Sequence, residues 1–272
     1  MWPPIINVMD NAARKAARGL IHDFGEIEQL QSSKNEPIDF ATKAFLNTKT
    51  TLKTELEKAR PDFAIIFSET EFRYDQKFAN RWIVKTLDGS TNFLHGIPHF
   101  AISIAYEERN ELIAGMVYDP LRDETFWALK GKGCYLNNRR LRVSARRKLE
   151  SALIASNSHG QKYLSKPGLL EAKEKEMNLT AGFRLSGTIA LDLAYVAAGR
   201  YDAFWNLHLT PTDVAAGIVL VREAGGLLSD VNGKNNPMKS GSIIATNNEL
   251  FNTVSLLLQN ISPKMGAKNS VT

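Results

Sequence analysis

The sequence predicts a mixed fold of the α/β class, α+β in its first half, with two lobes that meet near residue 145. Apolar residues recur at helix spacing in two stretches near the start of the chain. Closely spaced runs of β-branched and aromatic residues follow, and shorter strands and helices then alternate. We therefore expect an N-terminal α+β lobe over 1–145, a C-terminal α/β lobe over 146–262 and a disordered tail over 263–272.

The first lobe is expected to open with two helices and one strand. Apolar residues from Ala12 to Ile21 lie at helix spacing, and Gly25 is expected beyond the end of that helix. A second helix is predicted from about Ala44 to Ala59, because Pro61 cannot continue it. The apolar run 63–67 is too short for a helix and predicts a buried strand.

An antiparallel meander is predicted for the rest of the first lobe, because its strands are separated by short turns rich in Gly, Pro and Asn. The expected strands cover 82–84, 100–106, 112–118, 124–129 and 140–143. In the second lobe the expected strands cover 151–156, 201–205, 227–228 and 242–246. Its expected helices are a polar one over 164–178, an amphipathic one over 189–198, an apolar one over 214–224 before a Gly-Gly pair, and a last one over 249–257.

Composition is that of a soluble globular protein, with 43% hydrophobic residues, 23% charged residues and a net charge of +5. The basic residues cluster at 139–142 and 146–148, which indicates either an anionic partner or, more simply, the solvated rim of a hairpin. The single Cys134 excludes an internal disulfide and is expected to be a small core residue. With no secretory signal and no apolar run of membrane-spanning length, we expect a cytoplasmic protein without a membrane partner.

Several common site types are disfavoured. His95 and His99 have the spacing of zinc ligands on a helix, but Gly96 and Pro98 break any helix there, so we expect loop residues. The glycines flanking Lys132 lack the third glycine of a nucleotide fingerprint and predict a hairpin turn. No G-x-S-x-G segment indicates a serine hydrolase.

Two segments carry the candidate chemistry, WIVKTLDGSTNFLHG at 82–96 and PTDVAAG at 211–217. In the first, a strand brings Asp88 to a Gly-Ser-Thr turn whose N–H groups and hydroxyls could hold a phosphate. In the second, Asp213 opens an apolar helix, where a carboxylate either caps the helix or points into a cleft.

These segments resemble the signature motifs of the inositol monophosphatase family, W-I-x-D-P-L-D-G-T-T-N-F and P-W-D-x-A-A-G. The resemblance extends over nearly the whole chain, through 39–43, 68–69, 115–133 and 191–202. It implies a layered α-β-α-β-α sandwich, usually a homodimer. It also implies hydrolysis of inositol monophosphate or a related small sugar phosphate monoester by a water that Mg²⁺ activates.

The resemblance assigns roles to particular residues. The metal ligands it implies are Glu69, the carbonyl of Leu87, Asp88 and Asp213. The catalytic residues are Glu69 and Ser90. The substrate-binding residues are Gly89, Ser90, Thr91, Gly187 and Asn206. Without the motifs, the three carboxylates would be interpreted as surface or capping groups.

Five positions depart from the family pattern. Phe45, Thr70 and Lys85 stand where the family has carboxylates, Thr212 stands in place of a Trp, and Asn206 in place of a Glu. An ammonium about 4 Å from Mg²⁺ repels it by roughly 8 kcal/mol at an effective dielectric constant of about 20. We therefore expect that the full metal cluster cannot form and that the Lys85 ammonium lies among Glu69, Asp88 and Asp213 instead. A purely structural, neutralising role for Lys85 remains an alternative.

Three functions stay open at this stage. The first is a Mg²⁺-dependent phosphatase with altered metal use. The second is a non-catalytic binding or regulatory protein with an RNA or transcription-factor partner, as the resemblance implies for some bacterial members. The third is a phosphate-sensing dimer whose ligand lies on Gly89, Ser90 and Lys85.

Overall fold

The structure, a computed structural model, describes residues 2–30, 37–67, 78–157, 174 and 178–259. The polar helix expected over 164–178 falls almost entirely outside the described residues, and the tail at 263–272 lies wholly outside them. None of the described helices combines the length and apolarity needed to cross a membrane.

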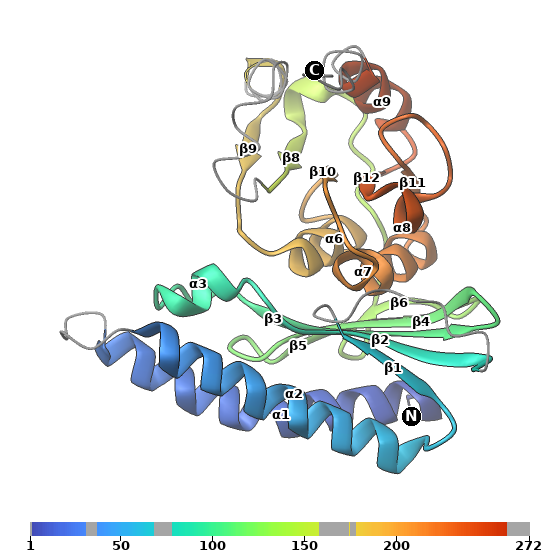
Figure 1. The fold of residues 1–272 in the computed structure, drawn as a ribbon. Helices are drawn as coiled ribbons and strands as arrows, with labels where there is room; N and C mark the ends of the chain where they lie inside the picture. Colours follow the sequence, from blue (N-terminus) through green and yellow to red (C-terminus); the bar gives the residue numbers. More distant parts are fainter. Residues whose placement is uncertain (1, 31–36, 68–77, 158–173, 175–177, 260–272) are drawn as a thin grey trace, which may run out of the picture.

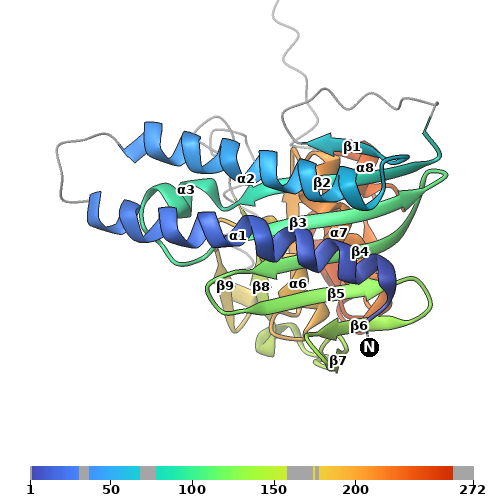
Figure 2. The same ribbon diagram turned by 90° about the horizontal axis from the view of Figure 1, so that it is seen from below.

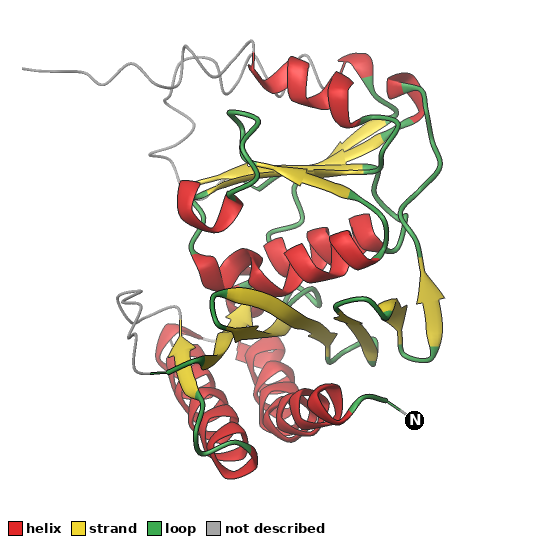
Figure 3. Ribbon diagram, turned by 90° about the vertical axis from the view of Figure 1, so that its right-hand side faces the viewer, coloured by secondary structure: helices red, strands yellow, loops and turns green. Residues whose placement is uncertain are grey.

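Five layers of alternating helix and sheet make up the molecule (Figure 1). Helices α1 (Pro4–Leu30) and α2 (Pro37–Ala59) cover one face of a 7-stranded sheet. Helices α6 (Ile189–Ala197) and α7 (Pro211–Glu223) separate that sheet from a 5-stranded sheet, and α9 (Phe251–Gln259) packs on the far side of the second sheet. Figure 3 shows the two sheets with the red helical layer between them. The predicted α-β-α-β-α order is confirmed.

The first sheet is the predicted meander with one parallel strand added at its edge. Its strands, in spatial as well as chain order, are β1 (Ala64–Phe67), β2 (Asn80–Asp88), β3 (Ala101–Glu108), β4 (Glu111–Asp119), β5 (Glu124–Leu129), β6 (Gly133–Leu136) and β7 (Arg139–Leu141). Only the β1–β2 pair is parallel among these described strands. Strand β6 was not predicted, because four residues between two turns show too little alternation. Figure 2 shows α1 and α2 lying across this sheet.

The second sheet has the order β11-β12-β10-β8-β9. Its strands are β8 (Leu153–Ala155), β9 (Gly182–Arg184), β10 (Ala203–Leu207), β11 (Leu227–Ser229) and β12 (Ser242–Thr246). Strand β8 pairs in parallel with both β9 and β10, so the carboxyl ends of these three strands meet at one edge. Strand β9 and three short helices were missed: α3 (Ser90–Leu94), α8 (Pro237–Ser240) and the 3₁₀ turn η1 (Leu149–Ser151). The division of the chain at residue 145 remains a prediction.

Helix α1 does not end before Gly25, contrary to our expectation, and continues to Leu30. The reason is burial: Phe24 and Ile27 extend the apolar stripe into the core beneath the sheet. A glycine inside a helix costs about 1 kcal/mol relative to alanine, whereas burying two large apolar side chains contributes roughly twice that or more.

Helix α6 is buried on all sides, so the expectation of an amphipathic helix over 189–198 was wrong. Only Tyr195 of α6 is less than fully buried. Helix α7 lies so close to the first sheet that β4 needs a glycine, Gly115, at the point of contact. A Cβ atom built on Gly115 of β4 would lie 2.5 Å from the carbonyl oxygen of Ala216 in α7. Similarly, a Cβ on Gly217 would lie 2.3 Å from Leu193 Cδ1 of α6.

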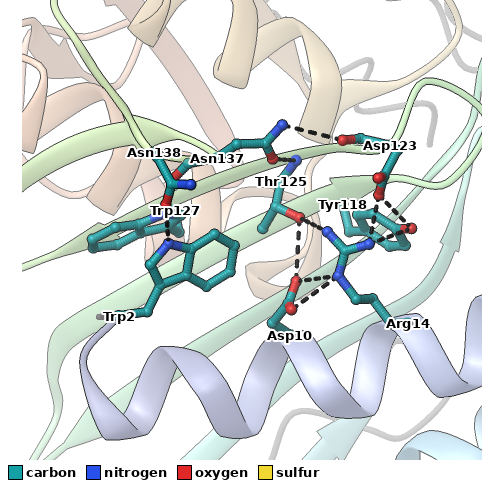
Figure 4. Close-up of polar contacts among 9 residues, drawn as sticks. All are labelled: Trp2, Asp10, Arg14, Tyr118, Asp123, Thr125, Trp127, Asn137 and Asn138. Atoms are coloured by element: carbon teal, nitrogen blue, oxygen red, sulfur yellow. Dashed lines mark hydrogen bonds and ion pairs between the residues drawn. The ribbon is translucent and has the colours of Figure 1, made fainter.

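Helix α1 is tied to the hairpin of β4 and β5 by one arginine (Figure 4). The Arg14 guanidinium donates to Asp10 one helical turn earlier, to Asp123 Oδ1 at 2.5 Å and to Thr125 Oγ1 at 3.2 Å. The Thr125 hydroxyl in turn donates to Asp10 Oδ1. The arginine therefore connects the outer helical layer to the sheet.

Replacing Arg14 by Met is expected to lower the free energy of unfolding by about 1 kcal/mol, because Asp10 and Thr125 lose a charged donor. The matched control is Lys15→Met on the same helix, whose solvent-screened pair with Glu55 should contribute less than that. Urea unfolding measures both values. Equal losses of stability in the two variants would show that the contacts of Arg14 with the β4–β5 hairpin contribute no more than an exposed ion pair.

Candidate functional site

Strand β2 brings the first group of candidate residues to the middle helical layer. Its pairing with β3 shifts register between Lys85 and Asp88, an irregularity that breaks the strict alternation of side chains. As a result, Lys85 reaches α7 and Asp88 reaches α6, whereas Leu87 packs in the core beneath α1 and α2. Two candidate side chains therefore face the second lobe from one strand end.

Lys85 and Asp213 form a direct ion pair, with 2.6 Å between Nζ and Oδ1. The other carboxylate oxygen of Asp213, Oδ2, accepts hydrogen bonds from the backbone N–H and the hydroxyl of Thr210, both at 2.7 Å. Burial raises the pKa of Asp213, but the charge of Lys85 and the hydrogen bonds from Lys85 and Thr210 outweigh it, so the pKa lies below its ordinary value. Asp213 is therefore a charged carboxylate with both oxygens engaged.

Asp88 is buried next to this pair. Its Oδ2 accepts the backbone N–H of Ala190 at 2.7 Å, near the start of α6. Burial raises the pKa of Asp88 to about 6, although the nearby Lys85 charge and the Ala190 N–H oppose the shift. The prediction that Lys85 lies among the carboxylates is supported for Asp88 and Asp213. Glu69 and Thr70 lie outside the described residues.

These residues do not fit a magnesium pair. Magnesium requires oxygen ligands in near-octahedral geometry at about 2.0–2.1 Å. The oxygen of Asp213 that faces β2 is instead bound by an ammonium, and its other oxygen is used by Thr210. Within the described ranges, no three His, Cys, Asp or Glu side chains are grouped as a metal site.

The predicted phosphate loop follows Asp88 directly. Gly89 has a left-handed backbone, with φ of 84°, and a Cβ there would lie 2.6 Å from Thr188 Cγ2, so only glycine fits. Ser90 and Thr91 begin the single turn of α3 and are exposed. Asn92 is buried behind them and donates to the carbonyls of His99 and Ser186, which joins this loop to the second lobe. As predicted, His95 and His99 lie outside any helix.

The loop after β9 is held by a network that the sequence did not reveal. Gly187, with φ of 83°, donates its N–H to Asn157 Oδ1 at 2.7 Å. The Asn157 amide and the Ser186 hydroxyl both donate to Asp192, which is fully buried. Burial raises the pKa of Asp192 to about 8, although these two hydrogen bonds oppose the shift. The available signal was an acidic residue inside the apolar stretch 189–198.

The remaining candidates lie on three different elements, β10, α7 and α2. Asn206 on β10 is buried, and its Nδ2 has no hydrogen-bond partner among the described residues. Thr212 is buried in the first turn of α7, with its hydroxyl 2.9 Å from that of Thr210. Phe45 on α2 lines a pocket that it shares with Ser90 and Thr91. The assignment of catalytic and ligand-binding roles to these residues stays a prediction.

Comparison with known proteins gives matches over almost the whole chain. A profile of the inositol monophosphatase family matches residues 2–262. A protein named inositol-1-monophosphatase from Rhizobium meliloti is 42% identical over 266 residues, 95% of this chain and 97% of that protein. A protein named Nus factor SuhB from Pseudomonas aeruginosa is 38% identical over 271 residues, 96% of this chain and 97% of that protein.

A solved structure also matches this chain over most of its length. The crystal structure of extragenic suppressor protein suhB from Bartonella henselae superposes with a TM-score of 0.84 at 42% sequence identity. It covers 94% of this chain and 100% of that chain.

The buried Asp192 predicts an unusual dependence of stability on pH. Its folded pKa of about 8 lies above the unfolded value of about 4, so the folded state holds the extra proton between these values. Stability from this group is therefore present below pH 4 and is lost as pH rises through 8. Between pH 5 and 8 we expect a loss on the order of 3 kcal/mol that is absent in Asp192→Asn. Urea unfolding at several pH values measures it, and parallel curves for the two proteins would contradict it.

Proposed function

The chain belongs to the inositol monophosphatase family, and from this premise we propose that it binds a small phosphate ester without magnesium and does not hydrolyse it. For the ester, the resemblance implies a phosphorylated polyol or sugar. The observation that carries the proposal is the ion pair of Lys85 with Asp213, 2.6 Å long. Lys85 supplies at this place the positive charge that the resemblance assigns to Mg²⁺ ions.

The rest of the site supports binding rather than turnover. Ser90 and Thr91 keep exposed hydroxyls after a glycine whose backbone only glycine adopts easily. Lys85 is paired with Asp213 but stays 22% exposed, so its ammonium can also donate to a phosphate oxygen, and unlike a metal it activates no water as a nucleophile. Asn206, which the resemblance assigns to substrate binding, is a buried amide whose Nδ2 has no hydrogen-bond partner among the described residues, and a ligand oxygen could satisfy such a donor.

The loss of magnesium chemistry is tested by Lys85→Asp, with Lys85→Met as the control that removes the charge without adding a ligand. We expect no phosphate release from inositol 1-phosphate by the native protein at millimolar Mg²⁺. In Lys85→Asp, Mg²⁺ at ten times its dissociation constant should raise the free energy of unfolding by about 1.4 kcal/mol. Thermal unfolding with and without Mg²⁺ measures this. The proposal fails if the native protein releases phosphate above a blank or gains as much stability from Mg²⁺ as Lys85→Asp.

Metal-free binding is tested separately by calorimetry in the presence of a chelator. Inorganic phosphate and inositol 1-phosphate should both bind the native protein, and Lys85→Met should weaken binding of each about tenfold or more, because it removes the positive charge. Absence of binding by both ligands would overturn this half of the proposal.

A regulatory role is the second candidate function. Relatives from Pseudomonas aeruginosa and Escherichia coli, 38% and 37% identical, are named Nus factor SuhB. The exposed edge strand β7 and the residue after it carry Arg139, Arg140 and Arg142. These features support an RNA or transcription-factor partner. The resemblance separately implies a homodimer.

This candidate predicts salt-dependent binding of single-stranded RNA. Fluorescence polarisation should show that the affinity falls at least tenfold between 50 and 200 mM salt, about the change that three phosphate contacts would give. Substitution of all three arginines by Glu should abolish binding. No binding at the lower salt concentration, or no effect of the substitutions, would count against an RNA partner. Sedimentation equilibrium tests the homodimer.

A further inference from the structure

A pocket of about 270 Å³ opens between helix α2 and the turn that carries the predicted phosphate loop. Its lining among the described residues is Ile38, Ala41, Thr42, Phe45, Leu87, Ser90, Thr91 and Leu94. Most of this lining is aliphatic or aromatic, and the polar side chains are three hydroxyls. The pocket therefore joins an apolar wall to the two hydroxyl residues that follow Gly89.

The apolar wall depends on Phe45. This residue stands where the family pattern has a carboxylate, and its side chain packs against the core beneath the first sheet. Ile38, about two turns earlier on α2, lines the pocket and leaves 54% of its surface exposed. An exposed large apolar residue at the edge of a pocket is surface that an apolar ligand group can cover.

The size of the pocket suits a compact group. An apolar cavity of about 150 Å³ is enough to hold a benzene molecule. A pocket of about 270 Å³ therefore holds one ring or a short branched chain, with room for its linking oxygen. Hydroxyl groups of a polyol would lose water there and find three protein hydroxyls at most among the described residues.

We infer that this pocket receives a compact apolar substituent, such as an aryl ring, carried by the phosphate ester that the protein binds. The inference rests on the proposed function, because the phosphate itself is assigned to the loop at Gly89–Thr91 and to Lys85. It changes the group beyond the phosphate from the polyol or sugar that the resemblance implies to a compact apolar one. The position of Phe45 links the two, because the residue that stands in place of a family carboxylate also adds an aromatic side chain to the apolar wall.

The test compares phenyl phosphate with inorganic phosphate and inositol 1-phosphate by calorimetry in a chelator. Phenyl phosphate should bind the native protein at least tenfold more tightly than inorganic phosphate, with a more negative heat-capacity change. Phe45→Asp should remove this preference. The matched control, Leu46→Asp, adds the same charge to the neighbouring residue, which is 53% exposed and outside the pocket, and should keep it.

A second variant guards against misfolding of Phe45→Asp. Ala41→Phe fills the pocket without adding charge, so it should also remove the preference for phenyl phosphate while leaving binding of inorganic phosphate unchanged. If inorganic phosphate binds and phenyl phosphate gains nothing, this inference fails and the proposed function stands. If neither ligand binds, both fail. Equal losses in Leu46→Asp and Phe45→Asp also overturn the inference.

Discussion

The ion pair between Lys85 and Asp213 is the interaction on which the character of the site depends. It joins the first sheet to the middle helical layer, and both side chains are largely removed from water. Removing one partner of a buried pair costs about 3–5 kcal/mol, because the other charge is left uncompensated. The lysine is thus held in place by the fold. A cation fixed by the fold cannot give way to a divalent metal without a large cost.

The middle helical layer explains why the site draws on both halves of the chain. Asp88 from the first sheet accepts a hydrogen bond from the start of α6, and Asn92 donates across to Ser186. Gly115 lets α7 approach the sheet until backbone meets backbone. The candidate site therefore draws on residues from both sides of the boundary predicted near residue 145.

Much of the fold was predictable because hydrophobic periodicity and turn residues mark the long elements. The placement of Lys85 beside Asp213 was predicted through the resemblance, which puts both positions in one site. The extension of α1 past Gly25 was not, because burial in the tertiary structure outweighs a local helix breaker. The network of Asn157 and Asp192 depends on contacts between distant segments, and no local pattern encodes such contacts.

Asp213 also has a structural role apart from any chemistry. Through Oδ2 it accepts the N–H of Thr210 and so closes the first turn of α7, the helix that both sheets share. Selection for a folded protein is sufficient to retain this carboxylate, whether or not the protein is catalytic. A conserved-looking motif aspartate such as Asp213 is therefore weak evidence for enzymatic activity. The residue opposite it on β2, here Lys85, says more about whether a metal can bind.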